Sequence, residues 1–228
     1  ARHMASTMRV RCISGCSIGF GLTLAMLVLI AGVVSGAPLL VQAQAPRSPT
    51  PAPVNGAVRV QTVAQGFEHP WALVFLPDGR LLVTERPGRV RLVERDGRLS
   101  EPLAGVPRGQ ASGQGGLLDA ALDPRFADNR LIYLAYAEPG EGRTAGTAVA
   151  RGRLGEGRLE DVQVVYRQQP KVEGANHFGS RLVFARDGTL FVTQGDRFTY
   201  RDGAQDLSVG FGKIVRINSD GSVPRDNP

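Results

Sequence analysis

The chain has 228 residues, of which 42% are hydrophobic, and this composition excludes disordered and collagen-like proteins. Its 29 glycines follow no three-residue period, and the long Ala/Glu/Lys/Leu runs of a helical bundle are missing. Residues 1–45 hold three arginines and no acidic residue, which leaves 24 cations and 21 anions in the rest of the chain. So small an excess, spread over the remaining residues, argues against a nucleic-acid-binding protein.

The first 45 residues have the organisation of a secretory signal peptide. We expect Met8 to be the initiator, and the residues before it to be a vector remnant or an upstream start. Two arginines follow, then an apolar stretch over residues 18–34, and then endings of the A-x-A type at Ala43 and Ala45. The alternative is an uncleaved membrane anchor, because the apolar stretch approaches the length that spans a bilayer. The cleavage site favours the signal peptide.

Residues 1–45 are therefore interpreted as the leader, and both cysteines, Cys12 and Cys16, lie in it. The mature chain would then have no disulfide and no thiolate metal site, so its stability would come from its core. Residues 46–57 are rich in proline and polar residues, which indicates an extended linker. We expect the folded domain over residues 58–228.

From residue 58 onward, short apolar runs alternate with turn sequences. The runs include LVFL, RLLVT, VRLVE, RLVFA and TLFVT, and the turns include PDG, RPG and RDG. Runs of four or five residues rich in Val, Leu and Phe between Asp-Gly or Pro-Gly pairs are typical of strands in hairpins. No helix is predicted.

One hairpin sequence is repeated. The segment LVFLPDGRLLVT at residues 73–84 aligns without gaps to LVFARDGTLFVT at residues 182–193, and a weaker copy, ALDPRFADNRLIYLAY, lies between them. Their spacing of about 50–60 residues is near that of a four-stranded propeller blade. Any antiparallel sheet protein can repeat hairpins, but the gapless match favours an all-β fold, a β-propeller of four-stranded antiparallel blades. About three such blades fit into the chain, so we expect it to be a fragment of a longer protein.

Three side chains are candidates for chemistry. Gln114 lies in SGQGGLLD, where glycines let the backbone bend at a strand entrance, although an ordinary turn between blades is the alternative. His177 lies in ANHFGSR just before a strand, where a neutral imidazole could accept a proton or could be an ordinary surface side chain. Asp196 lies in TQGDR, directly after the strand TLFVT.

His177 and Asp196 bracket a single predicted hairpin. Because antiparallel strands return to their starting edge, we predict that the two side chains lie within hydrogen-bond reach, on the order of 3 Å apart. Such a carboxylate would fix the tautomer of the histidine and stabilise its protonated form. The alternative is that Asp196 simply closes a turn.

Several common chemistries have no sequence signal here. The chain contains no P-loop, no G-x-G-x-x-G that opens a helix, no H-E-x-x-H and no G-x-S-x-G. Without βαβ units, a Rossmann-bound nicotinamide is excluded.

Eight motifs occur in a fixed order over residues 66–228. They are HPWALVFLPDGRLLVTER, GQGGLLD, LDPRF, NHFGSRLVF, QGDRF, AQDL, GKIVRIN and DGSVPRDNP. Together they resemble the N-terminal half of the soluble quinoprotein aldose sugar dehydrogenases of bacteria, the glucose/sorbosone dehydrogenase family. The resemblance implies a six-bladed β-propeller, of which about three blades are present here.

The resemblance also implies a periplasmic enzyme that uses pyrroloquinoline quinone (PQQ), with calcium, to oxidise the anomeric hydroxyl of aldoses to lactones. In the family, the histidine of the NHFG motif is the base and falls on His177. The acidic residue that supports it falls on Asp196, and the glutamine beside the quinone falls on Gln114. The motifs do not identify the metal ligands or the electron acceptor. A homodimer is considered for the complete protein. We expect the isolated chain to be inactive.

Two other functions are weighed against this one. The first is a calcium-dependent propeller hydrolase of the lactonase type, with Asn176 and Asp196 as its suggested calcium ligands. The second is a non-catalytic secreted propeller that binds a partner through its loops.

Overall fold

The computed structural model describes residues 60–227. The expected leader over residues 1–45, its two cysteines and the linker over residues 46–57 lie outside the described residues. Within the described part, no helix is long and apolar enough to cross a membrane.

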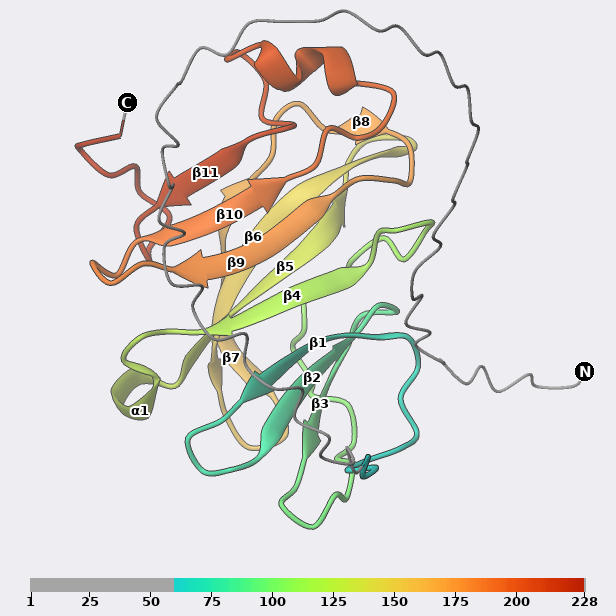
Figure 1. Ribbon diagram of the computed structural model, residues 1–228, viewed down its shortest axis with the longest axis vertical. Coiled ribbons are helices and arrows are strands. Elements are labelled where there is room, and N and C mark those ends of the chain that lie inside the picture. The colour runs from blue at the N-terminus through green and yellow to red at the C-terminus, as the bar shows by residue number, and fades with distance from the viewer. Residues whose placement is uncertain (1–59, 228) are drawn as a thin grey trace, which may run out of the picture. The chain divides into compact units, whose positions relative to one another are not determined.

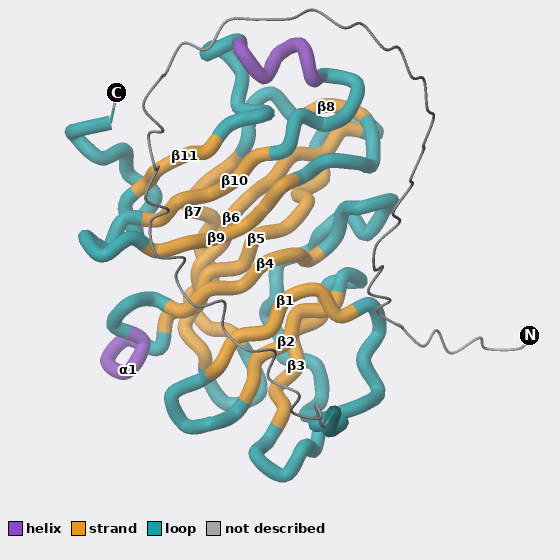
Figure 2. The backbone as a smooth tube through the Cα atoms, viewed as in Figure 1, coloured by secondary structure: helices purple, strands orange, loops and turns teal. Residues whose placement is uncertain are grey.

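The described residues form three antiparallel sheets (Figures 1 and 2). The first sheet contains β1 (Pro70–Phe75), β2 (Leu81–Glu85) and β3 (Arg89–Val93). The second contains β4 (Leu117–Leu122), β5 (Leu131–Pro139), β6 (Thr144–Leu154) and β7 (Leu159–Arg167), with β8 (Val172–Glu173) paired to β6. The third contains β9 (Gly179–Phe184), β10 (Leu190–Gln194) and β11 (Ile214–Ile217). In each sheet the main strands follow one another in chain order, as expected for propeller blades.

The middle sheet has the expected four strands in sequence order, whereas the first and third have three each within the described residues. An isolated bridge between Leu99 and Val93 lies at the free edge of β3, where a fourth strand would pair. The expectation of no helix is wrong for two short segments, α1 (Phe126–Asn129) and the 3₁₀ helix η1 (Arg201–Gln205). Helices of four or five residues are too short to carry an apolar period that sequence analysis could detect.

Asp-Gly turns close the hairpins in the same way at several places. Asp78 accepts a hydrogen bond from the amide of Arg80 at 3.0 Å, and Asp187 accepts one from the amide of Thr189 at 2.9 Å. The glycine between them, Gly79 or Gly188, has a φ of 86° or 84°, which an L side chain rarely adopts. The Asp-Gly pair therefore fixes the turn, and the turn fixes the register of the two strands.

The repeated sequence forms the same hairpin in all three sheets. Leu73 pairs with Val83 between β1 and β2, and the aligned Leu182 pairs with Val192 between β9 and β10. The weaker copy forms the turn from β4 to β5, with α1 inserted in it. The repeat predicted from sequence is thus confirmed, and the fold is a β-propeller arrangement of successive blades.

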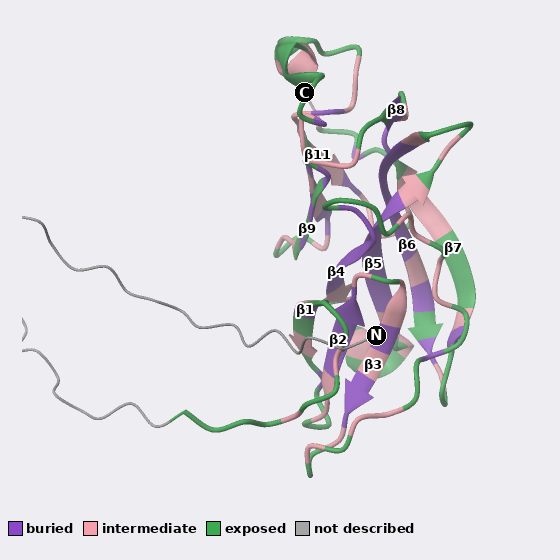
Figure 3. Cartoon of the chain, turned by 90° about the vertical axis from the view of Figure 1, so that its right-hand side faces the viewer, coloured by how far each residue is buried: buried purple, intermediate pink, exposed green. Residues whose placement is uncertain are grey.

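The core lies on both faces of the middle sheet. Along β5, Ile132, Leu134 and Tyr136 pack in a cluster with the first sheet. The alternate residues Tyr133 and Ala135 pack in a second cluster with the third sheet. Figure 3 shows β5 and β6 buried along most of their length. The period-two alternation of a strand therefore places one sheet on each side of the middle one.

Strands β1, β4 and β9 lie next to one another as the first strands of their sheets. Hydrogen bonds also join the neighbouring sheets, from β2 to β4 and from β9 to β4. The Thr84 hydroxyl donates to the Leu118 carbonyl at 2.6 Å, and the Leu182 amide donates to the Asp119 carboxylate at 2.8 Å. The loops that enter these three strands consequently meet at one end of the molecule, which is where the candidate site lies.

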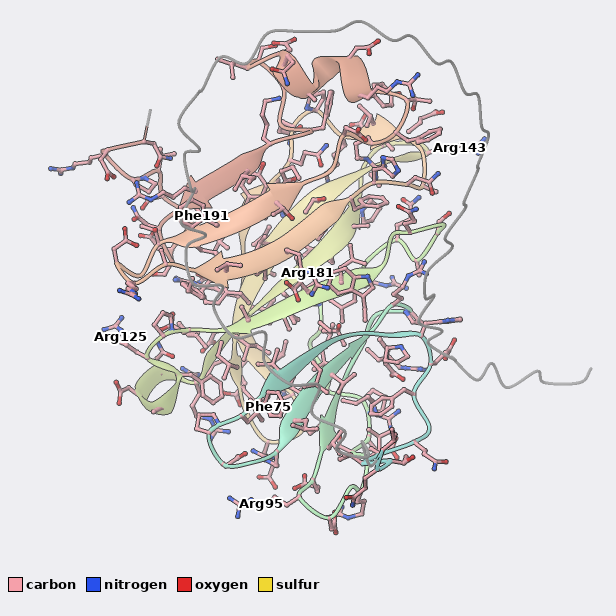
Figure 4. The ribbon with its side chains drawn as sticks, in the orientation of Figure 1. Phe75, Arg95, Arg125, Arg143, Arg181 and Phe191 are labelled. Atoms are coloured by element: carbon pink, nitrogen blue, oxygen red, sulfur yellow. The ribbon has the colours of Figure 1, made fainter. Side chains whose placement is uncertain are left out.

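The outward faces of the first and third sheets carry exposed apolar side chains. They include Leu73 and Phe75 on β1, Val183 on β9 and Ile214 on β11. Figure 4 labels Phe75 beside β1 and Phe191 on β10. Equivalent positions that face the middle sheet are buried, so burial of a repeat position depends on whether a neighbouring sheet covers it.

This difference generates a prediction. Leu73 and Leu182 occupy the same position in the repeated hairpin, but Leu73 is 52% exposed and Leu182 is 7% exposed. Leu182→Ala should lower the free energy of unfolding by about 2–5 kcal/mol, because it opens a cavity between two sheets. Leu73→Ala should lower it by less than about 1 kcal/mol. Urea unfolding of both variants measures the difference, and equal losses would contradict the assigned packing.

Candidate active site

His177 and Asp196 form a hydrogen-bonded pair at the open end of the third sheet. The distance from His177 Nδ1 to Asp196 Oδ1 is 2.7 Å. His177 lies two residues before β9 and Asp196 two residues after β10, and the two strands are paired up to Gly179 and Gln194. The separation of about 3 Å expected from the sequence is confirmed, and the catalytic roles of the two side chains stay predictions.

A glycine brings the two loops together. Gly195 lies against the main chain of His177, and a Cβ at position 195 would overlap the His177 carbonyl. The amide of Gly195 donates to the carbonyl of Phe178 at 3.1 Å. His177 itself has a φ of 51°, in the left-handed region that costs free energy for a residue other than glycine. A glycine at position 195 is therefore required for the close approach of the two loops.

The hydrogen bond favours the ionised form of the Asp196 carboxyl and selects the tautomer of the His177 ring. It holds the pKa of Asp196 below its ordinary value, and a hydrogen bond of 2.9 Å from the Phe198 amide adds to the effect. Because an ionised carboxylate only accepts hydrogen bonds, Nδ1 of His177 is the donor in this contact, which leaves Nε2 as the nitrogen with the lone pair whenever the ring is uncharged. Among residues 60–227, the structure records no hydrogen bond to Nε2.

Gln114 contacts the same loop. Its side-chain oxygen accepts a hydrogen bond from the His177 amide at 2.9 Å, and its own amide donates to the Ala175 carbonyl at 2.7 Å. Gly113, with a φ of 54°, leaves no room for a Cβ against Ala175. The Gly-rich loop before β4 is thus joined to the loop before β9, and all three residues singled out from the sequence come together.

A hollow of about 280 Å³ opens beside the pair. Its lining residues come from all three sheets and are Trp71, Arg86, Gln114, Leu118, His177, Phe178 and Gly179. Arg86 donates hydrogen bonds to the carbonyls of Gly113 and Gly115, so a guanidinium lies at this surface. The hollow combines a cation, an aromatic ring, an amide and an imidazole, which suits a polar planar ligand.

Trp71 and Arg86 were not predicted from the sequence as site residues. Arg181 on β9 lies 4.2 Å from the ring centre of Trp71 and donates to Asp119 on β4 at 3.2 Å, so β4 holds the cation that contacts the indole. The signal for Trp71 is the single tryptophan of the chain, next to the repeated strand. The 25 arginines of the chain gave no signal that could single out Arg86.

Two more missed residues follow Asp196 directly. The Phe198 ring packs edge-on against the His177 ring, with centroids 5.2 Å apart. Arg197 is buried beneath the loop that carries His177. No group of three or more His, Cys, Asp or Glu side chains within residues 60–227 is arranged to hold a metal ion.

Three blade-like sheets with a His–Asp pair at the entrance of their first strands define a β-propeller with a candidate acid–base site. Residues 67–228 match the sequence model of the glucose/sorbosone dehydrogenase family, so the chain belongs to that family. Aldose sugar dehydrogenase YliI of Escherichia coli is 47% identical over 174 residues, which are 75% of this chain and 47% of that protein.

Solved structures agree with this assignment. A crystal structure of a glucose dehydrogenase is 52% identical and covers 72% of this chain and 48% of its own, with a TM-score of 0.69. The PQQ-bound form of aldose sugar dehydrogenase from Streptomyces coelicolor is 31% identical and covers 74% of this chain and 50% of its own, with a TM-score of 0.66. The chain thus spans about half the length of the relatives it matches.

The His–Asp pair can be tested without any ligand. His177→Ala should return the pKa of Asp196 toward its ordinary value, because it removes the largest cause of the lowered value. Because the pKa of Asp196 is lower in the folded chain than in the unfolded chain, the pair stabilises the fold at pH values above the ordinary pKa of aspartate. This stabilisation is lost as the pH falls through the lowered pKa. Carboxyl ¹³C NMR titration measures the change.

Asp187 is the internal control for that titration. Its pKa is lowered to about 2 by hydrogen bonds from Thr189 and Arg216, at the opposite end of the third sheet. His177→Ala should leave it unchanged. An unaltered Asp196 titration in the variant would mean that the two side chains are not paired in solution.

Proposed function

We propose that this chain supplies the proton-accepting part of a PQQ-dependent aldose dehydrogenase, which oxidises the anomeric hydroxyl of a sugar to a lactone. The observation that carries the proposal is the 2.7 Å contact between His177 and Asp196 at the edge of the hollow. Membership of the dehydrogenase family supports it. The same membership favours it over a lactonase-type hydrolase with Asn176 and Asp196 as calcium ligands.

His177 is the general base of the proposed reaction. With Nδ1 donating to Asp196, the lone pair on Nε2 accepts the proton of the anomeric hydroxyl. The positive charge that develops on the ring is stabilised by the carboxylate, which also keeps the ring from rotating. Asp196 thereby orients the base and balances its charge without taking up the proton itself.

The residues around the hollow fit one side of PQQ, a planar molecule that carries carboxylates. The Arg86 guanidinium would bind an anionic edge, and Trp71 would provide an aromatic surface. Gln114 would lie beside the ring system while it holds the His177 amide. When bound, the quinone supplies the acceptor for the hydride that leaves the sugar.

Calcium, the periplasmic location and the signal peptide belong to the proposal as well. They rest on the resemblance of the motifs and on the order of charged and apolar residues in the leader. The proposed partners are an aldose substrate and an electron acceptor of unspecified chemistry. Homodimer formation is considered only for a protein of the relatives' full length.

The central test is sugar-driven dye reduction with added PQQ and calcium, in a protein of the relatives' full length that contains this chain. His177→Ala should lower kcat by roughly 100-fold or more, as expected for the loss of a general base. Gln114→Ala should act more on the affinity for cofactor or sugar. Wild-type turnover in the His177 variant would remove the proposed mechanism.

A second test concerns the 228 residues alone. The hollow is built from three sheets, and the relatives are about twice as long as the matched region. We expect no saturable PQQ binding at micromolar concentration, so any affinity would be weaker than about 8 kcal/mol. Calorimetric titration with PQQ and calcium measures it, and clear binding with sugar-dependent turnover would show that these blades suffice.

A further inference from the structure

Arg197 is an unusual buried cation. It is 1% exposed and is among the largest buried side chains in the described part of the chain. Within residues 60–227, the structure records no carboxylate paired with it, and its buried Nε has no hydrogen-bond partner. Burial lowers the pKa of Arg197 to about 10, so the guanidinium still carries its charge at neutral pH. An unpaired buried charge is unfavourable, and a hydrophobic side chain would fill the same space at lower cost.

The guanidinium of Arg197 contacts one short loop, residues 174–178. Its Nη1 donates to the Asn176 carbonyl at 2.8 Å, and its Nη2 donates to the Gly174 carbonyl at 2.6 Å. The guanidinium lies 3.5 Å from the ring centre of Phe178. Its backbone amide donates to the His177 carbonyl at 3.3 Å. One side chain therefore holds the loop on both sides of His177.

The same turn carries the partner of the histidine. Asp196 is the residue directly before Arg197, and a left-handed backbone at Arg197 and Phe198, with φ values of 57° and 63°, sends the two side chains to different places. Asp196 reaches the imidazole, while Arg197 reaches the carbonyls beneath it. Strained backbone of this kind persists where the surrounding contacts over-determine it.

We propose that Arg197 is a positioning residue for the reaction, and the proposal rests on the function proposed above for His177. Arg197 acts through the backbone of residues 174–178. By fixing the carbonyls of residues 174 and 176, it holds Nδ1 of His177 against Asp196. A planar guanidinium suits this task because its two donors are fixed relative to each other and can bind two carbonyls at once.

The test compares Arg197→Gln with a matched control, Arg91→Gln. Arg91 in the first sheet is largely buried, with 15% of its side chain exposed, and like Arg197 it donates to a backbone carbonyl, that of Ser100, at 2.6 Å. The readout that needs no cofactor is the Nδ1 proton of His177, observed by NMR in ¹⁵N-histidine-labelled chain and assigned with His177→Ala. Circular dichroism and unfolding midpoints are recorded for both variants.

In Arg197→Gln we expect the Nδ1 proton signal to be lost or strongly broadened. In a protein of the relatives' full length that contains this chain, kcat should fall by about 10-fold or more with KM changed by less than about 2-fold. Arg91→Gln should keep the signal and kcat, even where its unfolding midpoint falls. An unchanged signal and kcat in Arg197→Gln would overturn the proposal. Equal loss of the signal in both variants would also overturn it, because the signal would then follow general stability.

Two further results keep the test decisive. If Arg197→Gln does not fold, Arg197→Lys takes its place against Arg91→Lys, because lysine retains the charge but has a single donor nitrogen in place of the fork. Arg197→Lys should keep a weakened Nδ1 proton signal and an intermediate kcat. A signal equal to that of the wild type would overturn the proposal. If the wild-type signal depends on Arg197 but no sugar is oxidised at full length, the positioning stands and the proposed function fails.

Discussion

Burial of the middle sheet on both faces is the constraint on which the rest of the structure depends. β5 sends alternate side chains into two separate clusters, so the first sheet packs on one face and the third on the other. Each sheet by itself has only three or four main strands and would not bury a core. The stacking also places β1, β4 and β9 side by side, and it is this placement that brings the loops of the site together.

The site is assembled from loops that have little freedom. Glycine removes the side chain where the backbones of residues 177 and 195 meet, and several nearby residues are held in the left-handed region. Backbone hydrogen bonds and the contacts of Gln114 and Arg197 hold that geometry in place. If His177 is the proposed base, such a rigid loop means that little entropy is lost when a substrate reaches it, which is how positioning contributes to catalysis.

Charge is distributed unevenly around the hollow. Asp196 is ionised and faces the histidine, whereas Arg86 presents a guanidinium at the surface and Arg197 is a cation buried below the loop. The carboxylate favours a protonated ring once a proton has been taken up, and the arginine at the surface favours an anionic ligand. A site with these properties suits proton removal next to a negatively charged planar cofactor.

The sequence by itself determined the features that depend on neighbouring residues. Asp-Gly turns set the hairpins, the repeat at residues 73–84 and 182–193 set the succession of blades, and the two ends of one hairpin placed His177 beside Asp196. The short helices α1 and η1 were not predicted, because a helix of about one turn has no detectable apolar period. Only the tertiary structure decided that Trp71, Arg86 and Gln114 share a hollow with the histidine, because these contacts join loops from different sheets. The same holds for the burial of Arg197: a charged residue in a loop is expected at the surface, and only the packing of residues 174–178 over it removes it from water.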